Sequence, residues 1–150
     1  DSKQMQVHKD SDKKIKTIAG KFGDAEGPVK NHNVEPVYFD IELEEDKEFN
    51  FDLPPTHNSF IYLIEGEIKI GEKDHDKIKD STLIILDKGE KLKVRSVAKS
   101  KFLLISGKPI GETIARGGPF VMNTKEEIFK AIEDYQTGNF VQKWYNYADV

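Results

Sequence analysis

Cysteine is absent from this chain of 150 residues. Disulfide bonds, thiolate zinc sites and cysteine nucleophiles are therefore excluded, and stability must come from packing. Long apolar runs are also missing, since none approaches the roughly 20 residues that a membrane-spanning helix needs. No signal segment with basic residues before an apolar run opens the chain. We therefore expect an intracellular protein without a membrane partner, in the cytoplasm or the nucleus.

A basic surface is missing as well. Lysine and arginine number 23 against 27 aspartates and glutamates, which gives a net charge of −4. Proteins that bind nucleic acids usually concentrate positive charge on one face, because they neutralise phosphates. Direct binding of nucleic acid is therefore not expected. The content of 37% hydrophobic and 33% charged residues is typical of one globular domain with a single core.

Short segments that alternate apolar and polar side chains fill most of the chain. Residues 37–43 show this period-two pattern, which predicts a strand with one buried face. Further strands are expected at residues 15–19, 49–53, 60–64, 68–70, 82–86, 91–97 and 101–106, with turn residues between them. This succession predicts an all-β sandwich or barrel. Residues 1–14 are polar and lysine-rich and predict a linker or arm, and residues 22–35 predict a loop.

The end of the chain has the pattern of a helix. Thr124 can cap the first turn, and Glu127 can reach back to the cap, as in a capping box. Apolar residues then recur on one face, and Gly138 supplies a stop. The pattern predicts a helix over residues 125–137.

Four segments carry a resemblance to a known family. They are Pro36–Asp40 (PVYFD), Ser59–Gly71 (SFIYLIEGEIKIG), Ile105–Glu112 (ISGKPIGE) and Gly118–Gln136, which opens with GPFVMNTKEEI. These segments resemble the C-terminal cupin domain of the pirin family, and the last two are specific to it. Pirins are bicupins, with two β-barrels in one chain. The resemblance implies an all-β, RmlC-like jelly-roll cupin with a C-terminal helix over residues 15–150, and a longer parent chain.

The resemblance also implies a function. Intact pirins bind iron in the N-terminal barrel, several show quercetin 2,3-dioxygenase activity, and eukaryotic members act in the nucleus as transcriptional cofactors. Our first hypothesis is therefore a non-catalytic C-terminal cupin that packs on a metal-binding N-terminal cupin of the same parent. That parent would be an iron-binding, quercetin dioxygenase-like oxidoreductase, or a transcriptional cofactor with a protein partner. No active site is expected on the residues of this chain.

Metal ligands are part of what the resemblance implies. In cupins, two histidines close together on one strand, a carboxylate and a later histidine surround the metal, a donor set suited to iron. The histidines here are His8, His32, His57 and His75, and no two of them have this spacing. We therefore expect no metal and no other cofactor in this chain, and iron only in the N-terminal domain. His57, after two prolines, and His75, in a charged hairpin loop, are interpreted as solvated.

Two other patterns that could carry chemistry are weak. A Ser-His-Asp arrangement of Ser59, His57 and Asp52 would need the nucleophile turn G-x-S-x-G, and the sequence lacks it. Hydrolase activity is therefore not expected. The run Arg116–Pro119 could hold an anion through its backbone amides, but its two glycines more simply set the turn that leads into the helix.

Apolar surface leaves two further hypotheses open. The barrel interior, lined by side chains such as Phe49, Phe51 and Leu92, could take a small aromatic ligand, which would make the chain a binding module. The aromatic segment 140–147, which includes Trp144, could cover the seam to the missing barrel together with the N-terminal arm. A vacant seam favours self-association, so we expect a homodimer or a swapped assembly.

Overall fold

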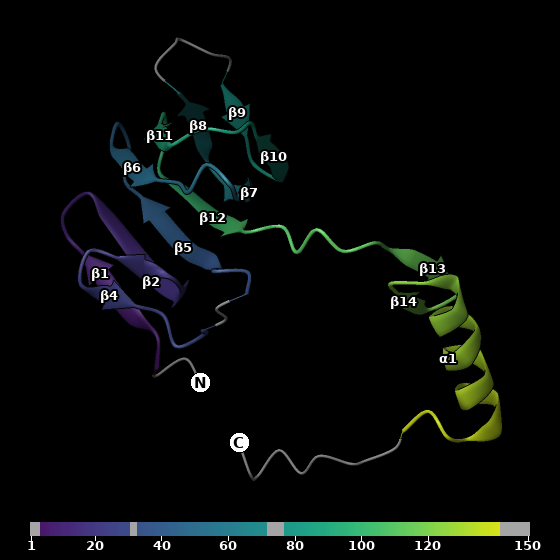
Figure 1. Ribbon diagram of the computed structural model, residues 1–150. Helices are drawn as coiled ribbons and strands as arrows, with labels where there is room; N and C mark the ends of the chain where they lie inside the picture. The colour runs from purple at the N-terminus through teal and green to yellow at the C-terminus, as the bar shows by residue number, and fades with distance from the viewer. Residues whose placement is uncertain (1–3, 31–32, 72–76, 142–150) are drawn as a thin grey trace. The chain divides into compact units, whose positions relative to one another are not determined.

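The structure is a computed structural model that describes residues 4–30, 33–71 and 77–141. It contains two compact units, residues 1–110 and residues 111–150, which we call the barrel unit and the C-terminal unit (Figure 1). The sequence predicted one domain over residues 15–150. Residues 109–114, which lie between the two units in the sequence, are exposed and belong to no strand.

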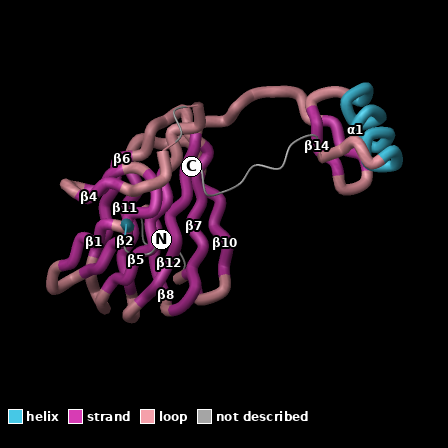
Figure 2. The backbone as a smooth tube through the Cα atoms, turned by 90° about the horizontal axis from the view of Figure 1, so that it is seen from below, coloured by secondary structure: helices cyan, strands magenta, loops and turns pink. Residues whose placement is uncertain are grey.

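The barrel unit is built on a six-stranded sheet, and Figure 2 shows its strands side by side. In spatial order the strands are β1 (Gln6–Lys9), β2 (Lys13–Ala19), β5 (Val37–Leu43), β12 (Ser100–Gly107), β7 (Asn58–Glu65) and β10 (Thr82–Leu86). All neighbouring strands pair antiparallel. Because β12 pairs with both β5 and β7, strands far apart in the sequence meet at the centre of the sheet.

A second sheet completes the barrel unit. Its strands, in spatial order, are β6 (Glu48–Asp52), β11 (Lys91–Ser96), β8 (Glu67–Ile70) and β9 (Ile78–Lys79). One hydrophobic core joins the two sheets, since it contains buried side chains from both. A short hairpin of β3 (Lys21–Phe22) and β4 (Ala25–Glu26) adds the ring of Phe22 to this core. The predicted all-β barrel is therefore confirmed.

Alternation along the central strands explains why these segments fold as they do. On β5 every second side chain from Val37 to Leu43 is buried, and β12 alternates in the same way. Burial of one large apolar side chain stabilises the fold by about 1.5–3 kcal/mol. A slip of one residue in register would expose the whole inward set, so the pattern also determines the register.

The N-terminal segment differs from the expected arm. Residues 6–9 form β1, which pairs with β2, and β2 itself begins at Lys13. Most of β1 is exposed, because it is the edge strand of its sheet. Its side chains therefore show no apolar alternation, and the sequence pattern cannot reveal such a strand. Within the expected loop 22–35, residues 25–26 likewise form β4.

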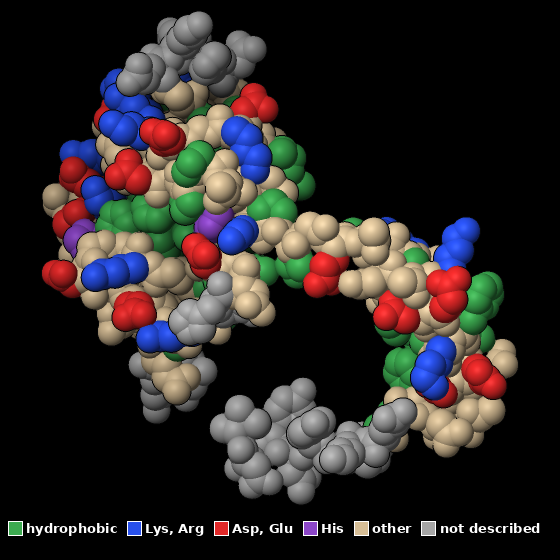
Figure 3. Space-filling view, viewed as in Figure 1, with side chains coloured by type: hydrophobic (Ala, Val, Ile, Leu, Met, Phe, Trp, Pro, Cys, Tyr) green, Lys and Arg blue, Asp and Glu red, His purple; other side chains and the backbone are tan. Residues whose placement is uncertain are grey.

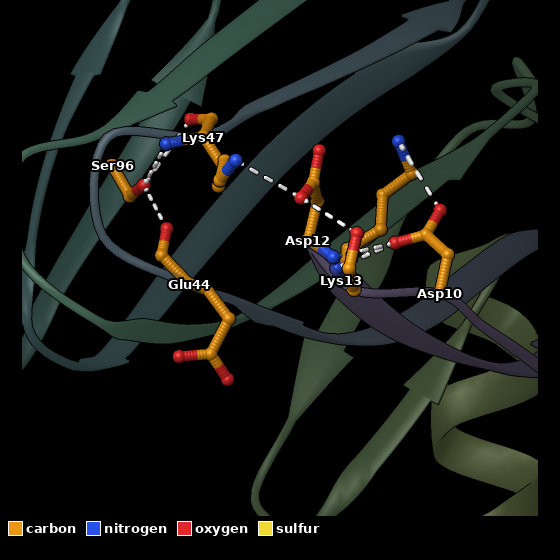
Figure 4. Close-up of polar contacts among 7 residues, drawn as sticks. Asp10, Asp12, Lys13, Glu44, Lys47 and Ser96 are labelled. Carbon is orange, nitrogen blue, oxygen red and sulfur yellow. Dashed lines mark hydrogen bonds and ion pairs between the residues drawn. The ribbon is translucent and has the colours of Figure 1, made fainter.

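Polar contacts tie the turns at one end of the barrel unit together (Figure 4). The buried hydroxyl of Ser96 accepts a hydrogen bond from the Lys47 amide at 3.0 Å and donates one to the Glu44 carbonyl. The Lys47 ammonium lies 3.0 Å from a carboxylate oxygen of Asp12, in the turn between β1 and β2. That turn is closed by the Asp10 carboxylate, which accepts from the Asp12 amide at 2.8 Å. The first hairpin is therefore anchored to the barrel.

The C-terminal unit consists of β13 (Ala115–Gly117), β14 (Phe120–Met122) and α1 (Lys125–Thr137). The predicted helix and its capping box are confirmed, since Thr124 Oγ1 accepts from the Glu127 amide and the Glu127 carboxylate accepts from the Thr124 amide. Gly138 ends the helix in the left-handed conformation. Across the part of the chain that the structure describes, no helix is long and apolar enough to cross a membrane.

Candidate functional site

Two of the four histidines lie among the described residues. His8, on β1, is half-buried, its ring packs edge-on against Phe22, and its Nε2 atom lies 3.4 Å from Asp10. His32 and His75 lie outside the described residues, so the interpretation of His75 as solvated stays a prediction. Over residues 4–30, 33–71 and 77–141, no group of three or more histidine, cysteine or acidic side chains is arranged to hold a metal ion.

His57 is buried, and the interpretation of it as a solvated loop residue is wrong. The side chain is 1% exposed. His57 directly precedes β7, and alternate residues of an extended chain share a face. It therefore continues the inward face of the strand, on which Ser59 and Ile61 are also buried.

A buried polar network holds the His57 ring. Its Nδ1 atom lies 3.1 Å from the hydroxyl of Ser106, which also accepts a hydrogen bond from the Ser59 hydroxyl at 2.8 Å. Ser59 and Ser106 pair directly across β7 and β12. The structure thus brings Ser59 and His57 together through Ser106, whereas Asp52 pairs with Lys91 in the other sheet. The arrangement is not a Ser-His-Asp triad.

A lysine fixes the backbone around His57. The Lys88 ammonium donates to the His57 carbonyl at 2.7 Å and to the side-chain oxygen of Asn58 at 2.8 Å. The His57 amide in turn donates to the Pro54 carbonyl at 3.0 Å. These contacts hold the segment between the two prolines and β7 in one conformation, so the position of the ring is defined by both its backbone and its side chain.

A pocket of about 310 Å³ opens beside His57. It is lined by Gly20, Lys21, Glu26, Gly27, Val29, Lys30, Glu35, Pro36, Val37, Pro54 and His57. A carboxylate oxygen of Glu35 lies 4.0 Å from His57 Nε2. Glu35 has a φ of 45°, a left-handed conformation that is uncommon for a residue with a side chain. At the rim, Lys30 lies 3.0 Å from Glu26 and lowers the pKa of that carboxyl.

Two residues of this site, Ser106 and Glu35, were not among those predicted from the sequence. Ser106 occupies the last inward position of β12, after the apolar residues Phe102 and Leu104, which have the same orientation. A polar residue at a position where the alternation predicts an apolar one was the available signal. Glu35 belongs to the expected loop, and its approach to His57 depends on chain segments that only the fold brings together, so no sequence pattern marks it.

The residues predicted to line an apolar interior lie mostly in the core. Phe49 and Leu92 are buried, and Phe51 packs against the core while partly exposed. The Phe51 ring stands edge-on to Phe39 at 5.0 Å between centroids and stacks on Phe49 at 6.3 Å. Phe51 and Leu92 do line a pocket, but the other residues that line it are polar or charged residues of β6 and β11. An aromatic ligand inside the barrel therefore stays a prediction.

The outer side of the six-stranded sheet is apolar over three neighbouring strands. It carries two rows of paired residues, Leu83, Tyr62 and Leu103 in one and Ile85, Phe60 and Ile105 in the other, which we call the outer apolar face. Leu83 is 56% exposed and Ile85 is 72% exposed, both on the edge strand β10. Figure 3 shows hydrophobic side chains at the surface of each unit. Contiguous exposed apolar residues of this kind are typical of surfaces that take part in interactions.

The C-terminal unit has aromatic surface of its own. Phe120, Tyr135 and Phe140 form a cluster, with ring centroids 5.3–6.3 Å apart. Within the run Arg116–Pro119, Arg116 and Gly117 belong to β13, and Gly118 and Pro119 form the turn to β14, so the run lies in a hairpin that precedes the helix. Trp144 and most of the expected aromatic seam lie outside the described residues.

Comparison with known proteins agrees with this architecture. Residues 38–141 match the family model of the pirin C-terminal cupin domain. A Pseudomonas aeruginosa protein provisionally named a quercetin 2,3-dioxygenase is 35% identical over 129 residues, which cover 83% of this chain and 45% of that protein. A pirin-like protein of Solanum lycopersicum is 40% identical over 104 residues, which cover 68% of this chain and 36% of the relative.

A solved structure extends the comparison to three dimensions. The crystal structure of quercetin 2,3-dioxygenase from Acinetobacter baumannii is similar with a TM-score of 0.81 and 27% identity, over 93% of this chain and 49% of that one. The chain thus spans about half the length, or less, of these relatives. The predicted family resemblance is confirmed, because the family model matches more than half of the chain. This chain belongs to the pirin family and contains its C-terminal cupin domain.

Proposed function

We propose that this chain is the non-catalytic cupin of a two-cupin, pirin-like protein, and that it packs on a metal-binding N-terminal cupin of the same parent. The share of its relatives that it spans, 45% and 36%, supports a parent with room for a second barrel. An iron-dependent dioxygenase activity, or a role as a transcriptional cofactor, would then belong to the whole parent. The chemistry would take place in the other barrel.

The outer apolar face is the observation that carries this proposal. A sheet with one side in the core and a second apolar side is typical of a sheet covered on both faces. Ile85 and Leu83 also lie on an edge strand, where unpaired backbone groups and exposed apolar side chains invite pairing with another chain. A second barrel would cover both features at once. Its side of the seam is expected to be apolar as well, since none of the six residues of the face is charged.

The donor groups of the described residues support the non-catalytic role. His57 has its Nδ1 atom engaged by Ser106, and His8 lies on the exposed strand β1. Neither has a second histidine beside it among the described residues, so neither begins a cupin ligand set. The barrel interior between the sheets is occupied by a core that includes Phe39, Phe49 and Phe102.

Co-expression of this chain with the N-terminal cupin of its parent tests the proposal. Ile85→Lys, which places a charge on the outer apolar face, is expected to abolish co-purification while leaving the β-sheet circular dichroism unchanged. Val7→Lys is the matched control, because Val7 is also an exposed apolar residue, 47% accessible, on the opposite edge strand β1. Equal co-purification of the Ile85→Lys and Val7→Lys variants would refute a docking role for this face.

The same face predicts the behaviour of the chain without its partner. Exposed apolar surface favours association of identical chains, so a homodimer is expected at high protein concentration. Sedimentation of the Ile85→Lys variant should then show monomer under conditions where the Val7→Lys variant still associates. Association that persists in the Ile85→Lys variant would assign the contact to another surface.

A further inference from the structure

The two ring nitrogens of His57 have different surroundings. Ser59 donates its hydroxyl hydrogen to Ser106, so the Ser106 hydrogen is left to donate to His57 Nδ1. If Nδ1 instead carried the proton, the Ser106 hydrogen would turn to Ser59 Oγ, and the lone pair of Nε2 would face the Glu35 carboxylate oxygen 4.0 Å away, which is unfavourable. Nδ1 is therefore the acceptor, and the neutral ring carries its proton on Nε2.

Nε2 is consequently a buried donor without an acceptor. The side chain is 1% exposed, and no hydrogen-bond partner of Nε2 lies in the described part of the chain. Glu35 Oε2, the carboxylate oxygen that faces it, is 4.0 Å away, which is beyond hydrogen-bond distance. Buried polar groups in folded proteins are nearly always satisfied, so this geometry points to a group that binds between the two residues.

The spacing selects the kind of group. For an oxygen atom about 2.8 Å from both Nε2 and Oε2, the angle Nε2···O···Oε2 would be about 90°. This angle suits an atom that accepts one hydrogen bond and donates another. A hydroxyl does this, since it accepts from Nε2–H and donates to the carboxylate. A ketone oxygen can only accept, and an ammonium group can only donate.

The walls of the pocket indicate the rest of the ligand. Val29, Val37 and Pro54 supply apolar contact. The charged lining residues are two lysines and two glutamates, Lys21, Lys30, Glu26 and Glu35, of which Lys30 and Glu26 are paired at 3.0 Å. Because these charges balance, the pocket offers an ion no net attraction, and a neutral ligand leaves no charge unpaired.

We propose that this pocket binds a small neutral alcohol, whose hydroxyl bridges His57 Nε2 and the Glu35 carboxylate and whose apolar body lies against Val37 and Pro54. The site is distinct from the outer apolar face and from the barrel interior. It therefore does not depend on the function proposed above, and either can fail without the other.

Titration of the whole chain with cyclohexanol and with cyclohexanone, followed by two-dimensional amide NMR, tests the proposal. Cyclohexanol should shift the amide signals of Gly20, Gly27 and Val37 and bind roughly tenfold more tightly than the ketone, which cannot donate to Glu35. A long-range proton–nitrogen spectrum of the histidine rings should report the His57 proton on Nε2. Equal affinity for both probes, shifts elsewhere in the chain, or no saturable binding of either probe would overturn the proposal. In the last case water would be the only occupant.

The Glu35→Ala variant isolates the bridging contact. The Glu35 side chain is 59% exposed, so this substitution should leave the fold intact, which the amide spectrum itself verifies. The variant is expected to lose the preference for the alcohol over the ketone. Glu45→Ala is the matched control, because Glu45 is exposed and follows the opposite end of β5. A preference retained in Glu35→Ala, or lost equally in Glu45→Ala, would contradict the bridging role.

Discussion

His57 and Ser106 are 49 residues apart in the chain, yet His57 Nδ1 lies 3.1 Å from Ser106 Oγ and both side chains are buried. Ser106→Ala leaves both the ring nitrogen and the Ser59 hydroxyl without their buried partner. The free energy of unfolding should therefore fall by about 1–3 kcal/mol, measured by denaturant titration. Ser59 and Ser106 share one hydrogen bond. Ser59→Ala should therefore lower the free energy of unfolding less in the Ser106→Ala variant than in the natural sequence. Strict additivity of the two substitutions would argue against the network.

The approach of Gly117 to Ile128 gives a prediction for the C-terminal unit. A Cβ atom at position 117 would overlap the Ile128 side chain, which α1 buries against the hairpin. Gly117→Ala should therefore loosen residues 111–141, seen as faster amide hydrogen exchange there, because overpacking costs roughly 1–3 kcal/mol. Gly89→Ala meets open space and serves as the control. Combining Gly117→Ala with Ile128→Leu, which removes the branched methyl, should restore much of the protection. Unchanged exchange in Gly117→Ala would show that the contact is not formed.

The turn between β1 and β2 predicts a pH dependence. The backbone amides of Asp12 and Lys13, each 2.8 Å from the Asp10 carboxylate, hold the pKa of Asp10 below its ordinary value. A pKa that is lower in the folded state means that the ionised carboxylate stabilises the fold above the unfolded pKa of about 3.9, and that this contribution is lost as the pH falls through the folded pKa.

Asp10→Ala should therefore be less stable than the natural sequence near neutral pH, and the difference should narrow as the pH falls below about 4. Denaturant titrations across the acid range measure it. Thr82→Ala is the control, since the Thr82 hydroxyl donates to the Lys79 carbonyl at 2.7 Å and does not ionise in this range. A difference for Asp10→Ala that stays constant with pH, as expected for Thr82→Ala, would mean that the charge of the carboxylate is irrelevant.

Metal analysis of the purified chain forms the last prediction. After dialysis against a chelator, the chain is expected to retain no stoichiometric iron or nickel, because the residues in the described ranges form no group of three or more donors. Elemental mass spectrometry measures this directly, and a metal-loaded pirin carried through the same dialysis is the control. One equivalent of metal retained by this chain would show that residues outside those ranges complete a site.

The sequence by itself determined the elements that depend on local periodicity and local contacts. The alternation over residues 37–43 predicted β5, because period-two burial is a property of the strand itself. The Thr124 and Glu127 pair predicted the start of α1, since a capping box forms within one turn. The segments that resemble pirins predicted the family, and the family match confirms them.

Tertiary structure decided which segments pack against the elements that these patterns form. Burial alternates along β7 and places Ser59 inward, but only pairing with β12 brings it opposite Ser106 and encloses His57 with them. The exposed strand β1 exists because β2 offers it an edge, which no pattern in residues 6–9 reveals. A period-two pattern tells which side chains share a face. What covers that face depends on contacts between distant segments, which only the folded chain brings together.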